Sequence, residues 1–185
     1  MRRALTITLI ALLAALAPTL GTEPATADPV PVETSAHREA TAKAKKTLRQ
    51  KGTVDRVVDG DTVDVVLKKS GRTIRVRMVG IDTPEVHGTV ECGGPEASRW
   101  LTKRLPESTK VILVSDPSQA RKDQYGRALR YVIRAKVRKD MNRAQLARGN
   151  ARLFVWKSNP FKRVKAYRKA QNNARDADRG IWGSC

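Results

Sequence analysis

The chain is short and strongly basic. Its 185 residues leave room for one domain and little else. It carries 37 Lys and Arg residues against 18 Asp and Glu residues, a formal net charge of +19. Because a charge of this size repels itself in the folded state, it usually serves an anionic partner such as nucleic acid or a membrane surface. A basic protein whose charge only maintains solubility is the alternative that charge alone leaves open.

The N-terminal segment has the pattern of a secretory signal peptide. Arg2 and Arg3 form a positive n-region, residues 4–17 form an apolar run, and residues 25–27 place small side chains at a cleavage site. The apolar run is shorter than the about 20 apolar residues that cross a bilayer. We therefore expect a signal peptide over residues 1–27 and a secreted, extracellular protein that keeps no transmembrane segment after cleavage. An uncleaved anchor is the alternative.

Residues 28–52 are expected to form a flexible basic leader. Pro, Ala, Thr, Glu and Lys dominate this segment, and such a composition does not bury a core. The folded domain is therefore expected over residues 53–185.

The first part of this domain has the pattern of an antiparallel β meander. Three β-type stretches are separated by turn dipeptides: residues 54–58, 63–67 and 74–78, with Asp59-Gly60 and Ser70-Gly71 between them. The alternation in the third stretch places Arg75 and Arg77 on the face opposite Val76 and Met78.

The rest of the domain mixes helices and strands. After a loop over 80–94 we expect, in chain order, a helix over 95–105, strands over 110–115 and 129–133, a helix over 141–148 that ends at Gly149, and a last helix capped by Asn159-Pro160. Five short strands with a few helices indicate an α+β fold, and a small closed barrel of the OB type is one such fold. The pattern alone does not separate this barrel from other α+β folds.

Acidic residues are scarce, and they gather in two short segments. Residues 59–62 read Asp-Gly-Asp-Thr, and residues 82–85 read Asp-Thr-Pro-Glu. In a meander both segments lie at the same end. Carboxylates concentrated in a basic protein indicate a hard cation, Ca²⁺ or Mg²⁺, held by oxygen ligands. Ordinary turn chemistry of Asp is the alternative for each segment taken alone.

Two arginines stand out by their position. Arg77 lies on a strand five residues before Asp82, and Arg127 follows the turn over 123–126. A guanidinium matches two phosphate oxygens at once and stays charged at any working pH. Because the chain has many arginines, a solvated surface charge is the alternative for each.

The chain has two cysteines, Cys92 and Cys185, and both lie in the part expected to be exported. An oxidising compartment favours their pairing in a disulfide. Two free thiols, or a bridge between two molecules, are the alternatives. A CxxC-type metal site is excluded because the two cysteines are far apart and no His cluster accompanies them.

The order of these segments resembles the staphylococcal nuclease family. Four stretches carry the resemblance: residues 58–63 (VDGDTV), 77–85 (RMVGIDTPE), 94–98 (GPEAS) and 123–127 (DQYGR). The resemblance extends from about Val54 to Trp182. Each stretch alone is a weak signal, but their combination in this order and spacing is specific.

This resemblance implies an α+β fold, an OB-fold five-stranded β-barrel with three helices, and Ca²⁺ as the cofactor. Matched position by position, it implies that Asp61 and Asp82 supply carboxylate ligands to the metal. It also implies that Thr83 supplies a backbone carbonyl.

The resemblance also implies catalytic roles. Glu85 would orient or deprotonate the attacking water, and Arg77 and Arg127 would grip the scissile phosphate. In the family, water attacks in line and the 5′-oxygen leaves, so that the products carry a 3′-phosphate.

Three aromatic residues match substrate-binding positions of the family. Tyr125 matches a tyrosine held near the bound nucleotide, and Phe154 and Trp156 approximately replace two tyrosines. Gln124 stands where the best-known member has a lysine, so one phosphate contact is expected to be missing. The stretch over 134–141 is longer than in that member and is expected to form a longer turn.

The function expected from the sequence is a secreted nuclease that cuts DNA, with RNA as a second candidate substrate. A monomer without a stable protein partner is expected. Two alternatives are a non-catalytic OB-fold protein that binds nucleic acid, and a secreted polycation that acts on membranes or anionic polysaccharides. The second alternative lacks the long amphipathic basic helix that membrane action favours.

Overall fold

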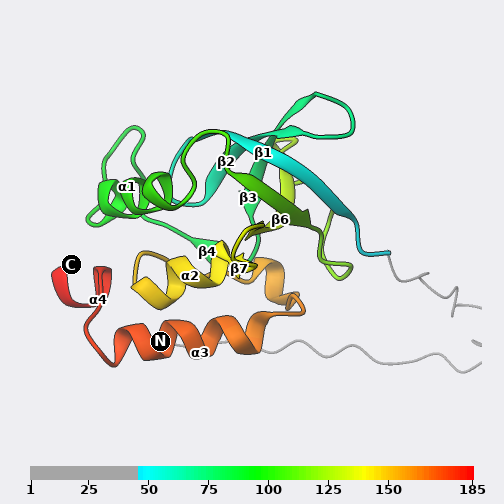
Figure 1. Cartoon of the computed structure of the whole chain (residues 1–185). Coiled ribbons are helices and arrows are strands. Elements are labelled where there is room, and N and C mark those ends of the chain that lie inside the picture. The colour runs from blue at the N-terminus through cyan, green and yellow to red at the C-terminus, as the bar shows by residue number, and fades with distance from the viewer. Residues whose placement is uncertain (1–45) are drawn as a thin grey trace, which may run out of the picture. The chain divides into compact units, whose positions relative to one another are not determined.

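Five strands form a closed barrel in the computed structural model, which describes residues 46–185 (Figure 1). The barrel strands are β1 (Arg49–Val57), β2 (Thr62–Leu67), β3 (Thr73–Met78), β5 (Lys110–Val114) and β6 (Ala128–Arg134). The sheet order is β3-β2-β1-β5-β6-β7, and a parallel pairing of β3 with β6 closes it. The predicted five-stranded barrel of the OB type is confirmed. The signal peptide expected over residues 1–27 lies outside the described residues.

Short strands and helices complete this unit. They are β4 (Ile81–Asp82), β7 (Lys139–Asp140), β8 (Arg152–Leu153), α1 (Gly94–Arg104), α2 (Met141–Arg148), α3 (Val164–Arg175), α4 (Ile181–Ser184) and a 3₁₀ turn (Trp156–Ser158). Helix α1 covers one side of the barrel, and α2 lies between the barrel and α3 (Figure 1). No helix within residues 46–185 is long and apolar enough to cross a membrane.

The register of β2 against β3 follows from burial. Val63 and Val65 on β2, and Val76 and Met78 on β3, are fully buried inside the barrel. Each such side chain contributes about 1.5 to 3 kcal/mol by leaving water. A slip by one residue would move these side chains outward and turn the arginines of β3 into the core. The outer face of β3 therefore presents its arginines, as the alternation predicts.

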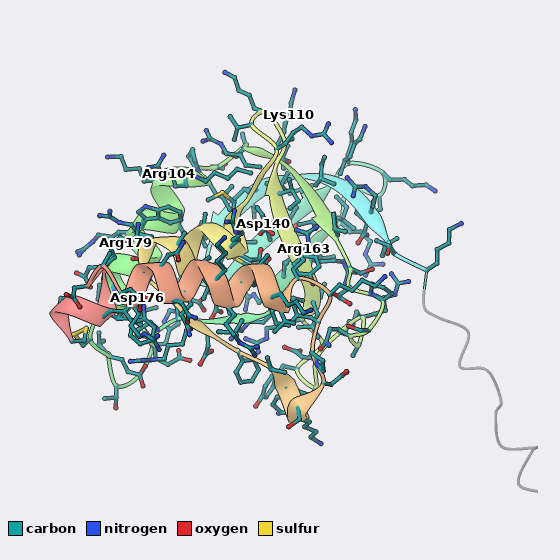
Figure 2. The ribbon with its side chains drawn as sticks, turned by 90° about the horizontal axis from the view of Figure 1, so that it is seen from below. Arg104, Lys110, Asp140, Arg163, Asp176 and Arg179 are labelled. Carbon is teal, nitrogen blue, oxygen red and sulfur yellow. A yellow bond between two sulfur atoms is a disulfide. The ribbon has the colours of Figure 1, made fainter. Side chains whose placement is uncertain are left out.

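Helix α3 is anchored to α2 by one carboxylate. Asp140, at the end of β7, accepts a hydrogen bond from the backbone N–H of Arg143 and thereby caps α2. Its other oxygen lies 2.6 Å from Nη1 of Arg163, just before α3, and the buried Tyr167 hydroxyl also donates to it. Figure 2 shows Arg163 and Asp140 on the side of the barrel where these two helices lie. This contact fixes α2, which in turn supports the site described below.

Two boundaries differ from the prediction. Strand β1 begins at Arg49 and not near Thr53, because its first residues pair with β5. The expected cap of the last helix at Asn159 is wrong, since α3 begins at Val164. The Asn159 amide instead donates to the carbonyl of Ser118, 3.0 Å away, and so closes a loop.

Candidate active site

The two acidic segments meet at one end of the barrel. The Asp61 carboxylate accepts hydrogen bonds from the backbone N–H and the hydroxyl of Thr83, at 3.0 and 3.3 Å. A Cβ on Gly60 would lie 2.6 Å from the Thr83 hydroxyl, so only glycine allows this approach. From α2, the buried Gln145 amide donates to the Gly60 carbonyl at 2.6 Å. The turn before β2 is therefore locked against the segment after β3.

Arg77 lies between the two carboxylates that the sequence assigns to a metal. Its Nε is 3.0 Å from Asp61 Oδ1, and its Nη2 donates to Asp82 Oδ1 at 2.7 Å. Its Nη1 donates to the carbonyls of Met78 and Ile81, at 3.1 and 2.6 Å. Only 14% of the side chain is exposed. The guanidinium is thus held in one orientation, with its positive charge between Asp61 and Asp82.

Burial shapes the electrostatics of Asp61. Removal from water raises the pKa of this carboxyl to about 7, because the ionised form loses its hydration. The Arg77 charge lowers the pKa but does not cancel the effect of burial, and the nearby Asp59 and Asp82 raise it further. A further positive charge close to Asp61 would favour its ionised form.

Arg127 is held by the turn that precedes it. The Asp123 carboxylate accepts from the backbone N–H of Arg127 at 2.9 Å and from its Nε at 2.6 Å. The same carboxylate accepts from the backbone N–H of Tyr125, and Gly126 takes the positive φ of 79° that the turn requires. With Nε engaged by Asp123, the outer nitrogens of Arg127 are the ones available to a ligand.

The carboxylate of Glu85 is exposed at the edge of the site. The backbone of Glu85 exchanges hydrogen bonds with Glu91: its N–H donates to the Glu91 carboxylate, and its carbonyl accepts from the Glu91 N–H. The next residue, Cys92, is joined by a disulfide to Cys185, with a Cα–Cα distance of 5.9 Å. The loop that carries Glu85 is therefore tied to the C-terminal end of the chain.

We expect loss of the disulfide to lower the free energy of unfolding by about 2 to 5 kcal/mol, because the bridge closes a long loop in the unfolded chain. Urea unfolding with and without reductant measures the difference. The double variant Cys92→Ser/Cys185→Ser is the matched control, since its stability should not respond to reductant. Two titratable thiols in the purified, unreduced protein would contradict the expectation.

A cleft of about 420 Å³ collects all six residues that the sequence assigns to catalysis and metal binding: Arg77, Glu85, Arg127, Asp61, Asp82 and Thr83. A second cleft, of about 510 Å³, shares two of them, Arg77 and Arg127. Tyr125, Phe154 and Trp156 line this second cleft, and each is exposed. The two guanidiniums therefore connect a charged cleft with an aromatic one.

Sequence reasoning missed several residues that position the site. Gln145 supports the turn at Gly60 although glutamine on a helix is usually exposed, and nothing in its local sequence marks it. Asp123 holds Arg127 in an ion pair. The two residues are four positions apart across a tight turn, and this spacing is a sequence signal for such a pair. Arg75, which the alternation placed on the outer face of its strand without a role, lines the charged cleft beside Arg77.

The three residues that the family resemblance assigns to a metal ion, Asp61, Asp82 and Thr83, all line the charged cleft. No three Asp, Glu, His or Cys side chains within residues 46–185 come together at metal-binding distances. Two carboxylates and one carbonyl fit a hard cation whose remaining positions are filled by water and substrate oxygens. The Arg77 guanidinium between Asp61 and Asp82 shows that the site already accommodates positive charge.

An OB-type barrel with carboxylates and arginines in one cleft defines a class of protein that acts on phosphate esters of nucleic acid. The family model for the staphylococcal nuclease homologue matches residues 75–184. The chain is 37% identical over 135 residues to a thermonuclease of Staphylococcus hyicus, covering 71% of this chain and 75% of the relative. It is 35% identical over 133 residues to a thermonuclease of Staphylococcus intermedius, covering 70% and 74%, and 34% identical over 133 residues to endonuclease YncB of Bacillus subtilis, covering 70% and 60%. The chain belongs to the staphylococcal nuclease family, and it is a nuclease that hydrolyses phosphodiester bonds.

Proposed function

We propose that the protein is a secreted, Ca²⁺-dependent nuclease that cleaves DNA, with RNA as a second candidate substrate, and leaves 3′-phosphorylated products. The observation that carries the proposal is the single cleft that brings Asp61, Asp82 and Glu85 together with Arg77 and Arg127. The direction of cleavage follows from the resemblance to the family.

The residues fit calcium through their chemistry. Asp61, Asp82 and the Thr83 carbonyl offer hard oxygen donors, which suit Ca²⁺ better than a soft metal ion. Burial disfavours the charge on Asp61, and a divalent cation beside it would offset this effect. When bound there, Ca²⁺ supplies charge neutralisation at the phosphate and at the developing transition state.

The two arginines are assigned to the scissile phosphate. A phosphodiester repels a nucleophile, and its five-coordinate transition state carries additional negative charge that fixed guanidinium donors stabilise. Arg127 reaches the cleft with its outer nitrogens while Asp123 holds Nε. Arg77 must exchange its contact with Asp61 or Asp82 for a phosphate oxygen, and a cation between these carboxylates would compensate them for that loss.

Glu85 is assigned to the attacking water. Its carboxylate is exposed, faces the charged cleft and lies on a loop fixed by Glu91 and by the disulfide. A carboxylate in this position orients the water and accepts its proton, which commonly contributes on the order of 10² to 10⁴ in rate.

The aromatic cleft is assigned to the nucleotide that neighbours the scissile bond. Tyr125, Phe154 and Trp156 are exposed, and the rings of the last two lie 6.1 Å apart. Exposed aromatic faces stack bases with little preference for sequence. A nuclease that contacts the phosphates of the backbone and stacks on the faces of the bases cleaves many different sequences.

Secretion and domain organisation are part of the proposal. The pattern of residues 1–27 supports a signal peptide, and the Cys92–Cys185 disulfide suits an oxidising compartment. The nuclease unit then extends from β1 to the C-terminal cysteine, preceded by a basic leader. A monomer is proposed.

Digestion of single-stranded DNA and RNA at the same Ca²⁺ concentration tests the proposed function. Turnover should vanish in excess chelator and return with Ca²⁺, while Mg²⁺, which requires tighter octahedral geometry, should support little of it. Product ends that a phosphatase acting on 3′-phosphates converts to hydroxyls identify the bond that breaks. Full activity in chelator would contradict the metal requirement, and binding without cleavage in Ca²⁺ would favour the non-catalytic alternative.

A further inference from the structure

A second pair of arginines lies beside the charged cleft and is held by one buried carboxylate. Asp64, in β2, is only 5% exposed although it faces away from the barrel core. It accepts hydrogen bonds from Arg75 through Nε and Nη2, at 2.8 and 3.0 Å, and from Arg56 through Nε, at 3.0 Å. Within residues 46–185, neither guanidinium has another hydrogen-bond acceptor. Both keep outer N–H groups for a ligand.

The backbone builds this arrangement on three neighbouring strands. Asp64 pairs directly with Arg75 on β3 and with Arg56 on β1. The pairing of β1 with β2 shifts between Val54 and Arg56, which marks a β-bulge at Asp55. A bulge places two successive side chains on the same side of a strand. Without it, alternation from the buried Val54 would turn Arg56 into the core.

The pair is aligned with the catalytic arginine. Arg75 and Arg77 are two residues apart on β3, so both lie on its outer face, with their Cα atoms about 6 to 7 Å apart along the strand. Both line the charged cleft. The step from Arg77 to Arg75 is comparable to the distance between neighbouring phosphates of a nucleic-acid strand. A strand whose scissile phosphate lies at Arg77 would therefore bring its neighbouring phosphate to Arg75.

The charge of the group suits an anion. Two guanidiniums share one carboxylate, which leaves a net positive charge, and hydrogen bonding to Arg75 lowers the pKa of Asp64, so that it stays ionised. The side chains of Arg75 and Arg56 are 47% and 61% exposed, whereas that of Asp64 is 7% exposed. The carboxylate is thus covered, and the positive ends of its partners face solvent.

We propose that Arg75, supported by Arg56 and oriented by Asp64, forms a subsite for the phosphate next to the scissile phosphodiester. The ligand class is a nucleic-acid strand with at least two consecutive phosphates. The inference rests on the proposed function, because it takes Arg77 as the residue at the scissile phosphate. A purely structural ion pair is the competing explanation.

The test compares two substrates in Arg75→Gln. One is an oligothymidylate of about ten nucleotides, within the usual site size of a single-strand binding barrel. The other is a nitrophenyl ester of a thymidine phosphate, which has one phosphodiester and no neighbouring phosphate. The ratio of variant KM to wild-type KM should be about five times larger for the oligonucleotide than for the small ester, with kcat unaffected. The slope of log KM against log salt for the oligonucleotide should fall by about 0.7, the value for one phosphate contact on a single strand.

Two further variants separate the subsite from general effects. Arg168→Gln removes the same charge from an exposed position on α3 that lines neither cleft, and it should not discriminate between the two substrates. Arg75→Lys keeps the positive charge but loses the paired N–H donors of the guanidinium. It should therefore keep the wild-type salt slope, with a smaller rise in KM than Arg75→Gln shows. Thermal unfolding of each variant reports whether the loss of the Asp64 contact disturbs the fold.

The outcomes are distinct. An equal loss on both substrates, or no loss on either, would overturn the subsite. If the wild-type protein cleaved neither substrate, the proposed function would fail. In that case, fluorescence anisotropy of the labelled oligonucleotide would still test Arg75, because an unchanged Kd in Arg75→Gln overturns the subsite independently of turnover.

Discussion

Replacing Arg127 or Arg77 with alanine is expected to reduce kcat by about 10² to 10³. The expectation follows from their assigned partner, since loss of one fixed donor at a developing oxyanion costs about 3 to 4 kcal/mol in comparable sites. Single-turnover kinetics on a labelled single-stranded oligonucleotide in Ca²⁺ measures the chemical step directly. If both variants kept rates near that of the wild type, these arginines would be surface charges and their assignment would be wrong.

The two variants should differ in stability, and this difference is informative. Arg127 is partly exposed and is paired with Asp123 at the surface, so Arg127→Ala should unfold close to the wild type. Arg77 is nearly buried and neutralises Asp61, so Arg77→Ala leaves a buried carboxylate without its partner and should be less stable above neutral pH. Arg127→Lys and Arg77→Lys keep the positive charge but lose the two parallel N–H donors of the guanidinium, so they should recover only part of the rate. Arg168→Ala serves as the control for removal of one positive charge.

Sequence reasoning reached the strands of the meander because the evidence for them was local, whereas the barrel itself was implied by the family resemblance. The alternation in β2 and β3 and the turn at Asp59-Gly60 are determined by neighbouring residues, and the structure has these elements as predicted. The meander then brings the two acidic segments together, which explains why the pattern indicated one site. The family resemblance supplied the catalytic and metal-binding roles of the residues in this site.

The remaining features depend on contacts between distant parts of the chain. The early start of β1 results from pairing with β5, some sixty residues away in sequence. The β-bulge before Arg56 leaves the apolar pattern almost unchanged, and the contact of Gln145 with Gly60 spans 85 residues. Such features are decided by tertiary packing, so no local propensity predicts them.

The site concentrates charges that oppose stability. Asp61 is buried with its charge incompletely compensated, and Arg77 is occupied by carboxylates although its proposed partner is a phosphate. Binding of the proposed cation and substrate would relieve both conditions: the cation would add positive charge beside Asp61, and the substrate phosphate would give Arg77 its anionic partner. This arrangement predicts that function and stability respond in opposite directions to a change at Asp61.

Asp61→Asn is expected to abolish Ca²⁺-dependent turnover and to raise the free energy of unfolding at pH 8 by a few kcal/mol. The pKa of Asp61 is raised by burial from an ordinary value near 3.8 to about 7, so the folded protein holds a proton that the unfolded chain has lost. Wild-type stability therefore falls as pH rises from about 4 to about 7 and levels off above that range. The variant lacks this decrease, so its advantage should grow over the same window.

Asp64 provides the matched control because its shift has the opposite sign. The arginines at Asp64 lower its pKa, so its ionised form stabilises the folded protein above the ordinary pKa and this contribution is lost as pH falls through the lowered value. Asp64→Asn should therefore be destabilised at pH 8, whereas Asp61→Asn should be stabilised. Urea unfolding of both variants between pH 4 and pH 8 without Ca²⁺ measures the two effects. A loss of stability in Asp61→Asn that is the same at both ends of this range would show that its hydrogen bonds outweigh the burial of its charge.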